Sequence, residues 1–420
     1  MKKILFVSFY WPPSGKASYH FPLKMIQYLN EKGHKIALLT VNEDTFSAKD
    51  ETFIQFIPDN LKVIKTGYFD PFIYYKKFLG KEKETPMFAT EVISTQKVSL
   101  KHKVSLWIRM NLFIPDARIG WYKQAVAAGK ELLKTEKYDV IITNGPPHSV
   151  HLIGVTLSKK FNIPLIPILI DPWVDIASYK NQTRNKFVVW LDNYLEEKTM
   201  KIAKAAVFVT KSMMNYFKNK YEFMNKKSFQ LYWGYNEEDF DELKDNKNKN
   251  EYKTILHAGN MYEYQNPKRF WETVKNKIDK GDKLRLKFIG SLAPNIKDNI
   301  VELGLDKYTE FLGFLDYKDV IKEIVNADYL LACTHEPRHV PGKLFEYMRA
   351  KKPIIVFGEE NKEVNELITK AGLGKYYSFN ENAEDFFDFA NTLNSSDTNI
   401  LCHNRRKIAM ELEKIINTVC

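Results

Sequence analysis

Residues 339–356 have the sequence HVPGKLFEYMRAKKPIIV. This stretch predicts a loop, then a short helix that begins near Gly342, and then an apolar strand that is buried on both faces. A helix that leads into such a strand is the repeating unit of α/β proteins with parallel sheets. The helix opens with Gly-Lys and carries a single acidic residue, Glu346, between two aromatic ones. We therefore expect the polar side chains of this segment to bind a ligand, although their apolar neighbours are packed in the core.

The start of this helix predicts a binding site for an anion. Backbone amides that are free at a helix N-terminus attract phosphate groups. Gly342 would let a phosphate approach the backbone closely, and Lys343 would add a positive charge. Glu346 could accept two hydrogen bonds from a vicinal diol such as a ribose. It is also compatible with a purely structural role, because the helix dipole favours an acid in the first turn.

The alternation of strands and helices extends in both directions from this stretch. Residues 3–9 and 35–41 are apolar runs on either side of a helical pattern over 22–31, which implies a βαβ unit and a parallel sheet. Further strands are expected at 138–143, 164–170, 206–210, 254–258, 284–289, 309–312, 328–333 and 353–357. Between the two groups of strands, residues 241–253 are polar and resemble a linker.

This pattern predicts two α/β domains in tandem. The expected boundaries are 1–235 for an N-terminal Rossmann-like domain and 236–400 for a C-terminal one. Residues 401–420 are expected to contain an amphipathic helix that packs back toward the N-terminal domain. Such a pair of domains binds its ligand in the cleft between the carboxyl ends of the two sheets.

The composition is that of a soluble globular protein, with 44% hydrophobic and 27% charged residues among 420. No apolar run is long enough to span a bilayer, and the N-terminal run is too short for a secretory signal. Three cysteines do not suggest a disulfide framework. We expect a cytoplasmic location, with peripheral attachment at the inner face of the plasma membrane as an option.

The formal net charge of +11 suggests an anionic partner. Residues 76–109 carry eight basic and three acidic side chains, interleaved with aromatic ones. This composition suits an anionic membrane surface, although a solvated basic face is equally compatible with it. A nucleic-acid partner is not expected, because the sequence has no zinc-finger spacing, RNA-binding signature or long arginine tract.

Motifs for metals and common cofactors are not found. The first βα turn lacks Gly-x-Gly-x-x-Gly, and Gly15-Lys16 lacks the preceding glycine of a P-loop. Asp239-Phe-Asp241 has the Asp-x-Asp spacing of some manganese-dependent sugar transferases, but it lies in a polar, linker-like stretch. The sequence contains no His-Glu-x-x-His and no Cys-x-x-Cys. We therefore expect neither a metal nor a cofactor.

Five segments, in this order along the chain, resemble the family-4 glycosyltransferases, also described as glycosyl transferases group 1. They are ILFVSFYWPPSGKASYHFPLKMIQYLNEKGH, DVIITNGPPHSVHLIG, LIDPW, FLGFLDYKDVIKEIVNADYLLA and PGKLFEYMRAKKPIIV. The resemblance covers nearly the whole chain. It implies a GT-B fold, in which two Rossmann-like domains with parallel sheets face a central cleft, and a retaining transfer from a nucleotide-sugar donor.

The resemblance also implies roles for individual residues. Glu346 matches the second glutamate of the family's paired-glutamate motif, which holds the nucleotide ribose, while Gly342 and Lys343 would face the diphosphate. The segment Phe311–Leu315 would border the base. The other candidates for the donor nucleotide are Gly259, Lys268, Arg269, Gly313, Phe314, Leu315 and Leu344. The catalytic candidates are Lys16, His148 and Lys343. The candidates for the acceptor or the donor sugar are Gly15, Asp171, Glu336 and Arg338.

The sequence departs from the family's pattern around the donor sugar. The family's first glutamate is expected eight residues before Glu346, where Arg338 stands, and Glu336 lies two residues away. Arg338 is expected to be exposed in a mobile loop. An arginine at this place suggests a donor sugar that carries a carboxylate.

Two further departures concern the phosphates. The family's glycine loop is usually Gly-Gly, and here it is Gly15-Lys16. The basic pair that clamps the diphosphate would lie near Asn260 and Gln265, and neither is basic. Its substitutes would be Lys268, Arg269 or Lys343.

Several of these residues are also compatible with structural roles. His148 could be a packing or helix-start histidine, Asp171 a turn acid, and Lys16 a solvated loop residue. Trp173 is expected in the core.

The sequence therefore predicts a metal-independent glycosyltransferase for hexosyl or related sugars. The donor would be a UDP-, GDP- or dTDP-sugar, and the acceptor a hydroxyl of a glycan or lipid-linked molecule in bacterial surface polysaccharide or glycolipid synthesis. The alternatives are a catalytically degenerate GT-B protein that binds a glycan or a partner, and a nucleotide-sugar epimerase. Glu346→Gln distinguishes the transferase from the degenerate protein, since it should weaken nucleotide binding only if the donor site is real. Conversion of the donor in the absence of an acceptor would identify the epimerase.

Overall fold

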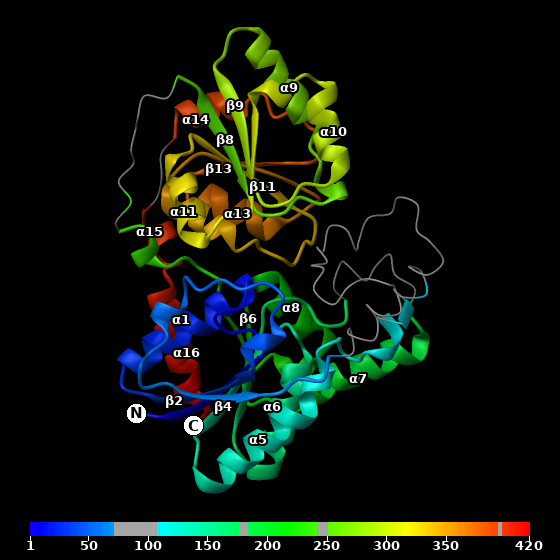
Figure 1. The fold of residues 1–420 in the computed structure, drawn as a ribbon, viewed down its shortest axis with the longest axis vertical. Coiled ribbons are helices and arrows are strands. Elements are labelled where there is room, and N and C mark those ends of the chain that lie inside the picture. The colour runs from blue at the N-terminus through cyan, green and yellow to red at the C-terminus, as the bar shows by residue number, and fades with distance from the viewer. Residues whose placement is uncertain are drawn as a thin grey trace. The chain divides into compact units, whose positions relative to one another are not determined.

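The structure, a computed structural model, describes residues 1–70, 104, 107–108, 110–175, 184–241, 243, 251–393 and 397–420. These residues form two compact units (Figure 1). The first unit runs to Tyr232 and also includes Arg406–Cys420, and the second is Trp233–Arg405. Most of the basic span 76–109, and most of the polar stretch 241–253, lie outside the described residues.

The first unit is built on a parallel sheet with the strand order β3-β2-β1-β4-β5-β6-β7. Its strands are β1 (Lys3–Ser8), β2 (Lys35–Val41), β3 (Lys62–Thr66), β4 (Val140–Gly145), β5 (Leu165–Leu169), β6 (Ala206–Phe208) and β7 (Ser228–Gln230). Because β1 pairs in parallel with both β2 and β4, the predicted βαβ unit is confirmed. The central strands are buried along nearly their whole length, as strands covered on both faces must be.

Helices connect these strands, and the last helix of the chain also belongs to this unit. The helices are α1 (His20–Glu31), α5 (Tyr122–Thr135), α6 (Ser149–Phe161), α7 (Lys186–Ile202), α8 (Lys211–Lys220) and α16 (Arg405–Val419). α1 ends where Gly33 takes a φ of 87°, a value that glycine adopts without strain. His34 Nε2 lies 3.0 Å from the Glu413 carboxylate, which ties α16 to the loop after α1.

The second unit repeats the architecture with a parallel sheet of order β10-β9-β8-β11-β12-β13. Its strands are β8 (Lys253–Ala258), β9 (Leu284–Ile289), β10 (Thr309–Gly313), β11 (Tyr329–Thr334), β12 (Ile354–Gly358) and β13 (Gly374–Tyr377). Its helices are α9 (Lys268–Asp279), α10 (Pro294–Glu302), α11 (Tyr317–Asn326), α12 (Lys343–Ala350), α13 (Lys362–Lys370), α14 (Phe386–Asn391) and α15 (Asp397–Leu401).

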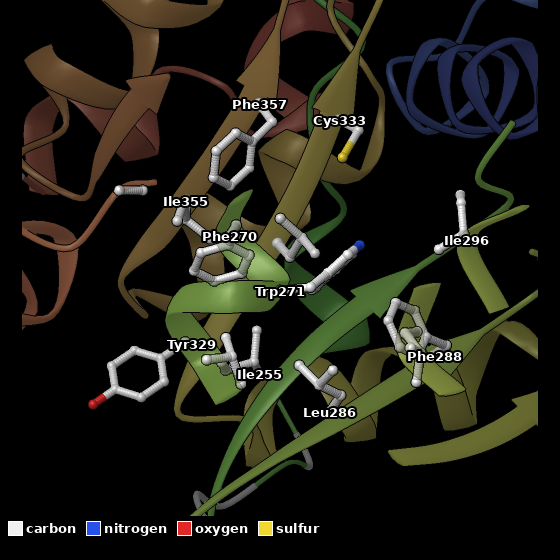
Figure 2. Close-up of a cluster of buried hydrophobic side chains, with 14 of the residues drawn as sticks. Ile255, Phe270, Trp271, Leu286, Phe288, Ile296, Tyr329, Cys333, Ile355 and Phe357 are labelled. Atoms are coloured by element: carbon white, nitrogen blue, oxygen red, sulfur yellow. The ribbon is translucent and has the colours of Figure 1, made fainter. Parts of the chain in front are cut away.

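The core on one face of the second sheet fixes the ends of its strands. In Figure 2 the aromatic side chains of α9 lie among the side chains of the central strands. The ring centroids of Phe270 and Phe357 are 5.2 Å apart, and those of Trp271 and Phe288 are 6.0 Å apart. The Trp271 indole also donates to Asn266 Oδ1 at 2.9 Å. α9 is therefore held against β9 and β12 by aromatic packing, and the hydrogen bond ties it to the loop that precedes it.

Both sheets have a point at which the strand order changes direction. In the first sheet it lies between β1 and β4, and in the second between β8 and β11. In open parallel sheets, ligands bind outside the carboxyl ends of the strands at this point. The segments that follow β1, β4, β8 and β11 are therefore the places to look for functional side chains.

Candidate functional site

Three glycines line the carboxyl edge of the second sheet. Gly259 follows β8, Gly290 follows β9 and Gly313 ends β10, with φ values of 111°, 95° and 65°. The Gly259 amide donates to Ile289 O at 2.8 Å, and the Gly290 amide donates to Gly313 O at 2.6 Å. A Cβ atom on Gly290 would lie 2.8 Å from the Gly259 backbone. Glycine at position 290 is therefore required for the segments after β8 and β9 to approach so closely, and the positive φ values favour glycine at all three positions.

Lys343 reaches this edge from the start of α12. Its Nζ lies 3.1 Å from His257 Nε2, and a Cβ atom on Gly259 would lie 3.2 Å from the same Nζ. The ammonium group can only donate, so His257 Nε2 accepts and His257 Nδ1–H donates to Leu331 O at 3.0 Å. β8 and β11 together hold the lysine at the switch point.

Burial lowers the pKa of both members of this pair. Burial lowers the pKa of Lys343 to about 8, and the nearby Cys333 and Glu346 oppose the shift. Burial, reinforced by Lys343, holds the pKa of His257 well below its usual value, so the imidazole stays neutral and continues to accept. A partly buried cation that lies against a neutral ring suits an incoming anion.

Glu346 lies one turn further along α12. Its Oε1 accepts a hydrogen bond of 2.7 Å from the Tyr317 hydroxyl at the start of α11. Burial raises the pKa of Glu346, while Arg405 and the Tyr317 hydrogen bond oppose the shift. Arg405 is itself fully buried and donates to Trp233 O at 3.2 Å. Arg405 was not predicted, because only the fold brings its charge near Glu346.

Gly342 packs directly against an indole ring. A Cβ atom at this position would lie 2.8 Å from Trp233 Nε1, which explains the glycine without reference to a ligand. The Leu344 and Phe345 amides donate to Pro341 O and Gly342 O at 3.0 Å and 3.1 Å. These two amides are therefore engaged in the first turn, and Lys343 supplies the positive charge there.

Asn260 and Gln265, near which the resemblance predicted a basic pair, hold loops together. Asn260 Oδ1 accepts from the Ser291 amide and hydroxyl, both at 3.0 Å. Gln265 accepts from the Tyr262 amide at 3.0 Å and donates to Cys333 O at 3.2 Å. Their expected substitutes Lys268 and Arg269 are exposed at the start of α9.

Arg338 is mostly buried and is held by an ion pair. The expectation of an exposed residue in a mobile loop was therefore wrong. Its guanidinium Nε lies 2.7 Å from Glu336 Oε1, and its side chain is 16% exposed. Asn361, at the start of α13, donates to the carbonyls of Glu336 and His339 at 3.2 Å and 2.9 Å. The loop after β11 is therefore fixed by side chains, which the local sequence did not indicate.

The segment Phe311–Leu315 lies at the edge strand of the second sheet. Phe314 is highly exposed, and Phe311 is partly exposed while its ring stacks on Phe288 at 5.6 Å between centroids. Leu315 follows Phe314 before α11 begins. Flat apolar surface is available here for an aromatic base.

The predicted residues of the first unit follow three neighbouring strands. Gly15 and Lys16 come after β1, His148 after β4 and Asp171 after β5. The Gly15 amide donates to Ala48 O at 2.8 Å, and Lys16 is exposed. The fold thus brings these candidates to one carboxyl edge of the first sheet.

His148 stacks on Trp173, and this tryptophan is buried in the core as predicted. The ring centroids are 5.1 Å apart and the planes differ by 7°. His148 Nδ1 is buried and has no hydrogen-bond partner among the described residues. Burial lowers the pKa of His148 to about 4. The ring is therefore neutral at physiological pH and can accept a proton or a hydrogen bond.

A methyl group at Gly259 should disturb the lysine without unfolding the unit. Gly259→Ala adds a Cβ 3.2 Å from Lys343 Nζ at a φ of 111°, so we expect a stability loss of about 1 kcal/mol together with weaker nucleotide binding. Gly281→Ala is the matched control, because its φ is 100° and a Cβ there meets nothing within 4 Å. Thermal melts with and without nucleotide measure both effects. Equal nucleotide shifts in the two variants would contradict a diphosphate site beside Gly259.

In the part of the chain that the structure describes, no cluster of three or more His, Cys, Asp or Glu side chains is arranged to hold a metal ion. Within those same residues, no helix combines the length and the apolar character needed to cross a bilayer.

Residues 252–394 match the family model described as Glycosyl transferases group 1. A comparison with curated protein sequences gave no match. Among solved structures, a glycosyltransferase from Rickettsia africae covers 100% of this chain and 98% of its own, with a TM-score of 0.65 at 14% identity. A sucrose-phosphate synthase from Thermosynechococcus elongatus covers 100% and 99%, with a TM-score of 0.64 at 12% identity.

The Anabaena protein HepE, solved in complex with UDP-glucose, covers 100% of this chain and 98% of its own, with a TM-score of 0.58 at 13% identity. The expected α/β fold of the GT-B type, with two Rossmann-like domains, is thereby confirmed. The chain resembles the glycosyl transferases group 1 in the sequence of its second unit and in its fold.

Proposed function

We propose that the chain is a retaining glycosyltransferase that takes its sugar from a nucleotide diphosphate donor. The observation that carries the proposal is the position of Lys343, a partly buried cation 3.1 Å from a neutral His257, beside the glycine-lined switch point of the second sheet. Glu346 lies one turn away on the same helix, at the spacing that suits a ribose beside a diphosphate. The match of residues 252–394 to the group 1 model supports this assignment.

In the proposed reaction, the bond between the sugar C1 and the diphosphate oxygen breaks while the acceptor oxygen bonds to C1 on the same face. The proton of the acceptor hydroxyl passes to the leaving phosphate oxygen. Lys343 stabilises the negative charge that develops on that phosphate, which is catalysis by a preorganised charge. Lys268 and Arg269 are further candidates for the diphosphate, and Gly313, Phe314, Leu315 and Leu344 for the rest of the nucleotide.

The acceptor side of the proposal rests on the carboxyl edge of the first sheet. Gly15, Lys16 and Asp171 are the candidates for contact with the acceptor, and neutral His148 could accept a hydrogen bond from its hydroxyl. A lipid-linked or glycan acceptor of bacterial surface synthesis, hexosyl transfer and independence from metals remain predictions from the resemblance.

Arg338 should act on the donor sugar through Glu336. The ion pair fixes the Glu336 carboxylate two residues from the place where the family has its first glutamate. We expect Arg338→Ala to raise the KM for the donor by about tenfold, because the loss of one charge-assisted hydrogen bond costs about 1.5 kcal/mol. Arg349→Ala, which removes another ion-paired arginine of the same unit, is the control. An unchanged KM and an unchanged preference among neutral and carboxylated donors would contradict this role.

The test of the proposed function is nucleotide release from a panel of UDP-, GDP- and dTDP-sugars. We expect one donor to release its nucleoside diphosphate faster when a hydroxyl acceptor is added, and the product to keep the anomeric configuration of the donor. Conversion of donor to a new nucleotide sugar without acceptor would identify an epimerase instead. If no nucleotide binds, the degenerate GT-B alternative replaces the proposal.

A further inference from the structure

Helix α7 buries two of its acidic side chains and exposes its aromatic ones. Asp192 and Glu196 are fully buried. Asp192 accepts hydrogen bonds of 2.8 Å from the Trp173 indole and 2.6 Å from Arg184. Glu196 accepts a bond of 2.7 Å from Lys220. The inner face of α7 also contains the buried apolar residues Val188 and Met200, and its aromatic side chains lie on the opposite, exposed side.

Three aromatic residues form the outer face of the first turns of α7. Phe187, Trp190 and Tyr194 are 63%, 59% and 47% exposed. Their spacing of three and four residues places them on one side of the helix. Their rings are in contact, with centroids 5.6 Å apart for Phe187–Trp190 and 6.1 Å for Trp190–Tyr194. We name these three residues the aromatic stripe.

The exposed apolar surface continues beyond α7. The Asn185 backbone amide at the start of α7 donates to Asn111 Oδ1 at 2.6 Å, so Asn111 lies beside the first turn of α7. Next to Asn111, Leu112 is 62% exposed, and Trp107, whose carbonyl accepts from the Asn111 amide at 2.9 Å, is 48% exposed. Clustered exposed side chains of this size mark an interaction surface.

The charges around the stripe indicate which partner it fits. Lys186 is exposed beside Phe187, and Lys198 Nζ lies 5.5 Å from the centroid of the Tyr194 ring. Tryptophan and tyrosine with flanking lysines are typical of the boundary between lipid headgroups and acyl chains. Lysine is depleted at protein–protein interfaces, which argues against a protein partner. The net charge of +11 of the chain favours a negatively charged partner. A negatively charged bilayer surface is therefore the complementary partner.

We propose that the aromatic stripe inserts into the headgroup region of an anionic membrane, with Lys186 and Lys198 contacting phosphate groups. The stripe lies outside the span 76–109, which sequence had suggested for this role. The proposal does not depend on sugar transfer, since nucleotide binding at Lys343 and Glu346 is measured separately. Membrane contact at α7 would place a lipid-linked acceptor near the first unit.

The test is co-sedimentation of the full chain with vesicles of phosphatidylglycerol and phosphatidylcholine, or of phosphatidylcholine alone. We expect wild type to sediment with the anionic vesicles and to be released by salt. Phe187→Ser with Trp190→Ser and Tyr194→Ser should weaken sedimentation by about tenfold or more, because three interfacial aromatic side chains are lost. The matched control replaces three exposed apolar residues elsewhere, Tyr252, Val301 and Met410, by serine and should bind as wild type does.

Two further variants make the assignment specific. Trp190→Phe should retain vesicle binding but lose part of the blue shift in tryptophan fluorescence, and Lys186→Glu with Lys198→Glu should weaken binding to anionic vesicles alone. The proposal is overturned if wild type does not sediment at low salt, or if the control triple variant loses as much binding. It is also overturned if light scattering shows that the stripe variant only dissociates a dimer, because the partner is then a second copy. Nucleotide-induced thermal shifts, unchanged in all variants, verify that each is folded.

Discussion

Glu346→Gln is expected to weaken the binding of the nucleoside diphosphate by roughly 30- to 150-fold. A buried carboxylate that accepts hydrogen bonds from a ribose diol contributes about 2 to 3 kcal/mol more than a neutral amide. The amide oxygen of the variant can still accept from the Tyr317 hydroxyl, which now lies 2.7 Å from Glu346 Oε1. The fold should therefore survive, so that the loss reports on the ligand. Isothermal titration with the preferred nucleotide measures it.

The chain offers a close control for this substitution. Glu363 is also 7% exposed and also lies in the first turn of a helix, α13, of the second unit. Glu363→Gln should leave nucleotide affinity within about twofold of wild type, since distant sites act independently. If both variants lose affinity equally, or if neither does, Glu346 does not hold the ribose.

Lys343→Met is expected to lower kcat by about 10²- to 10³-fold, as the loss of one preorganised charge at the leaving group does in other enzymes. Lys343→Arg should recover part of the rate, because arginine keeps the charge but has a different shape. The methionine variant fills similar volume and no longer buries a charge, so its melting temperature should not fall. A normal kcat with a raised KM would instead mean that the lysine only binds the ground state.

The charge of Lys343 also predicts opposite pH effects on binding and on stability. Its pKa is about 8 in the folded protein and 10.5 when unperturbed. Above pH 8 the ammonium is lost, so diphosphate affinity should fall, whereas in Lys343→Arg it should stay constant. Between pH 8 and 10.5 the unfolded chain binds more protons, so this residue alone makes the free energy of unfolding rise with pH. Nucleotide titrations and urea melts between pH 8 and 10.5, on wild type and on Lys343→Arg, test the predicted direction of both effects.

The fold was predictable because its signals are local. Apolar runs such as Ile4–Val7, and the glycines and prolines between them, depend only on neighbours in sequence, and the expected parallel sheets are confirmed. The observed strand boundaries differ from the predicted ones by one or two residues where a strand continues into polar residues, as β4 does through Asn144 and Gly145. Periodicity also detected α12 and the strand that follows it.

The site was predictable only in part, because its contacts join distant segments. The sequence indicated Lys343 and Glu346. His257, which lies 3.1 Å from Lys343, and Arg405, whose charge acts on Glu346, carry no motif and approach these residues only through the fold. For the same reason the loop with Arg338 was expected to be mobile, although Glu336 within it and Asn361 outside it fix its position. The burial of Asp192 and Glu196 in α7 depends on partners from other elements and could not be read from its own sequence.

The most direct test of a nucleotide-sugar donor site in the second unit is a thermal-shift panel. UDP, GDP, dTDP, ADP and CMP are added to wild type, Glu346→Gln and Glu363→Gln, each with and without EDTA. We predict that one nucleoside diphosphate stabilises wild type and Glu363→Gln, that EDTA does not change the shift, and that Glu346→Gln loses it. A wild-type melting temperature that none of these nucleotides changes would contradict the donor site and with it the proposed transferase.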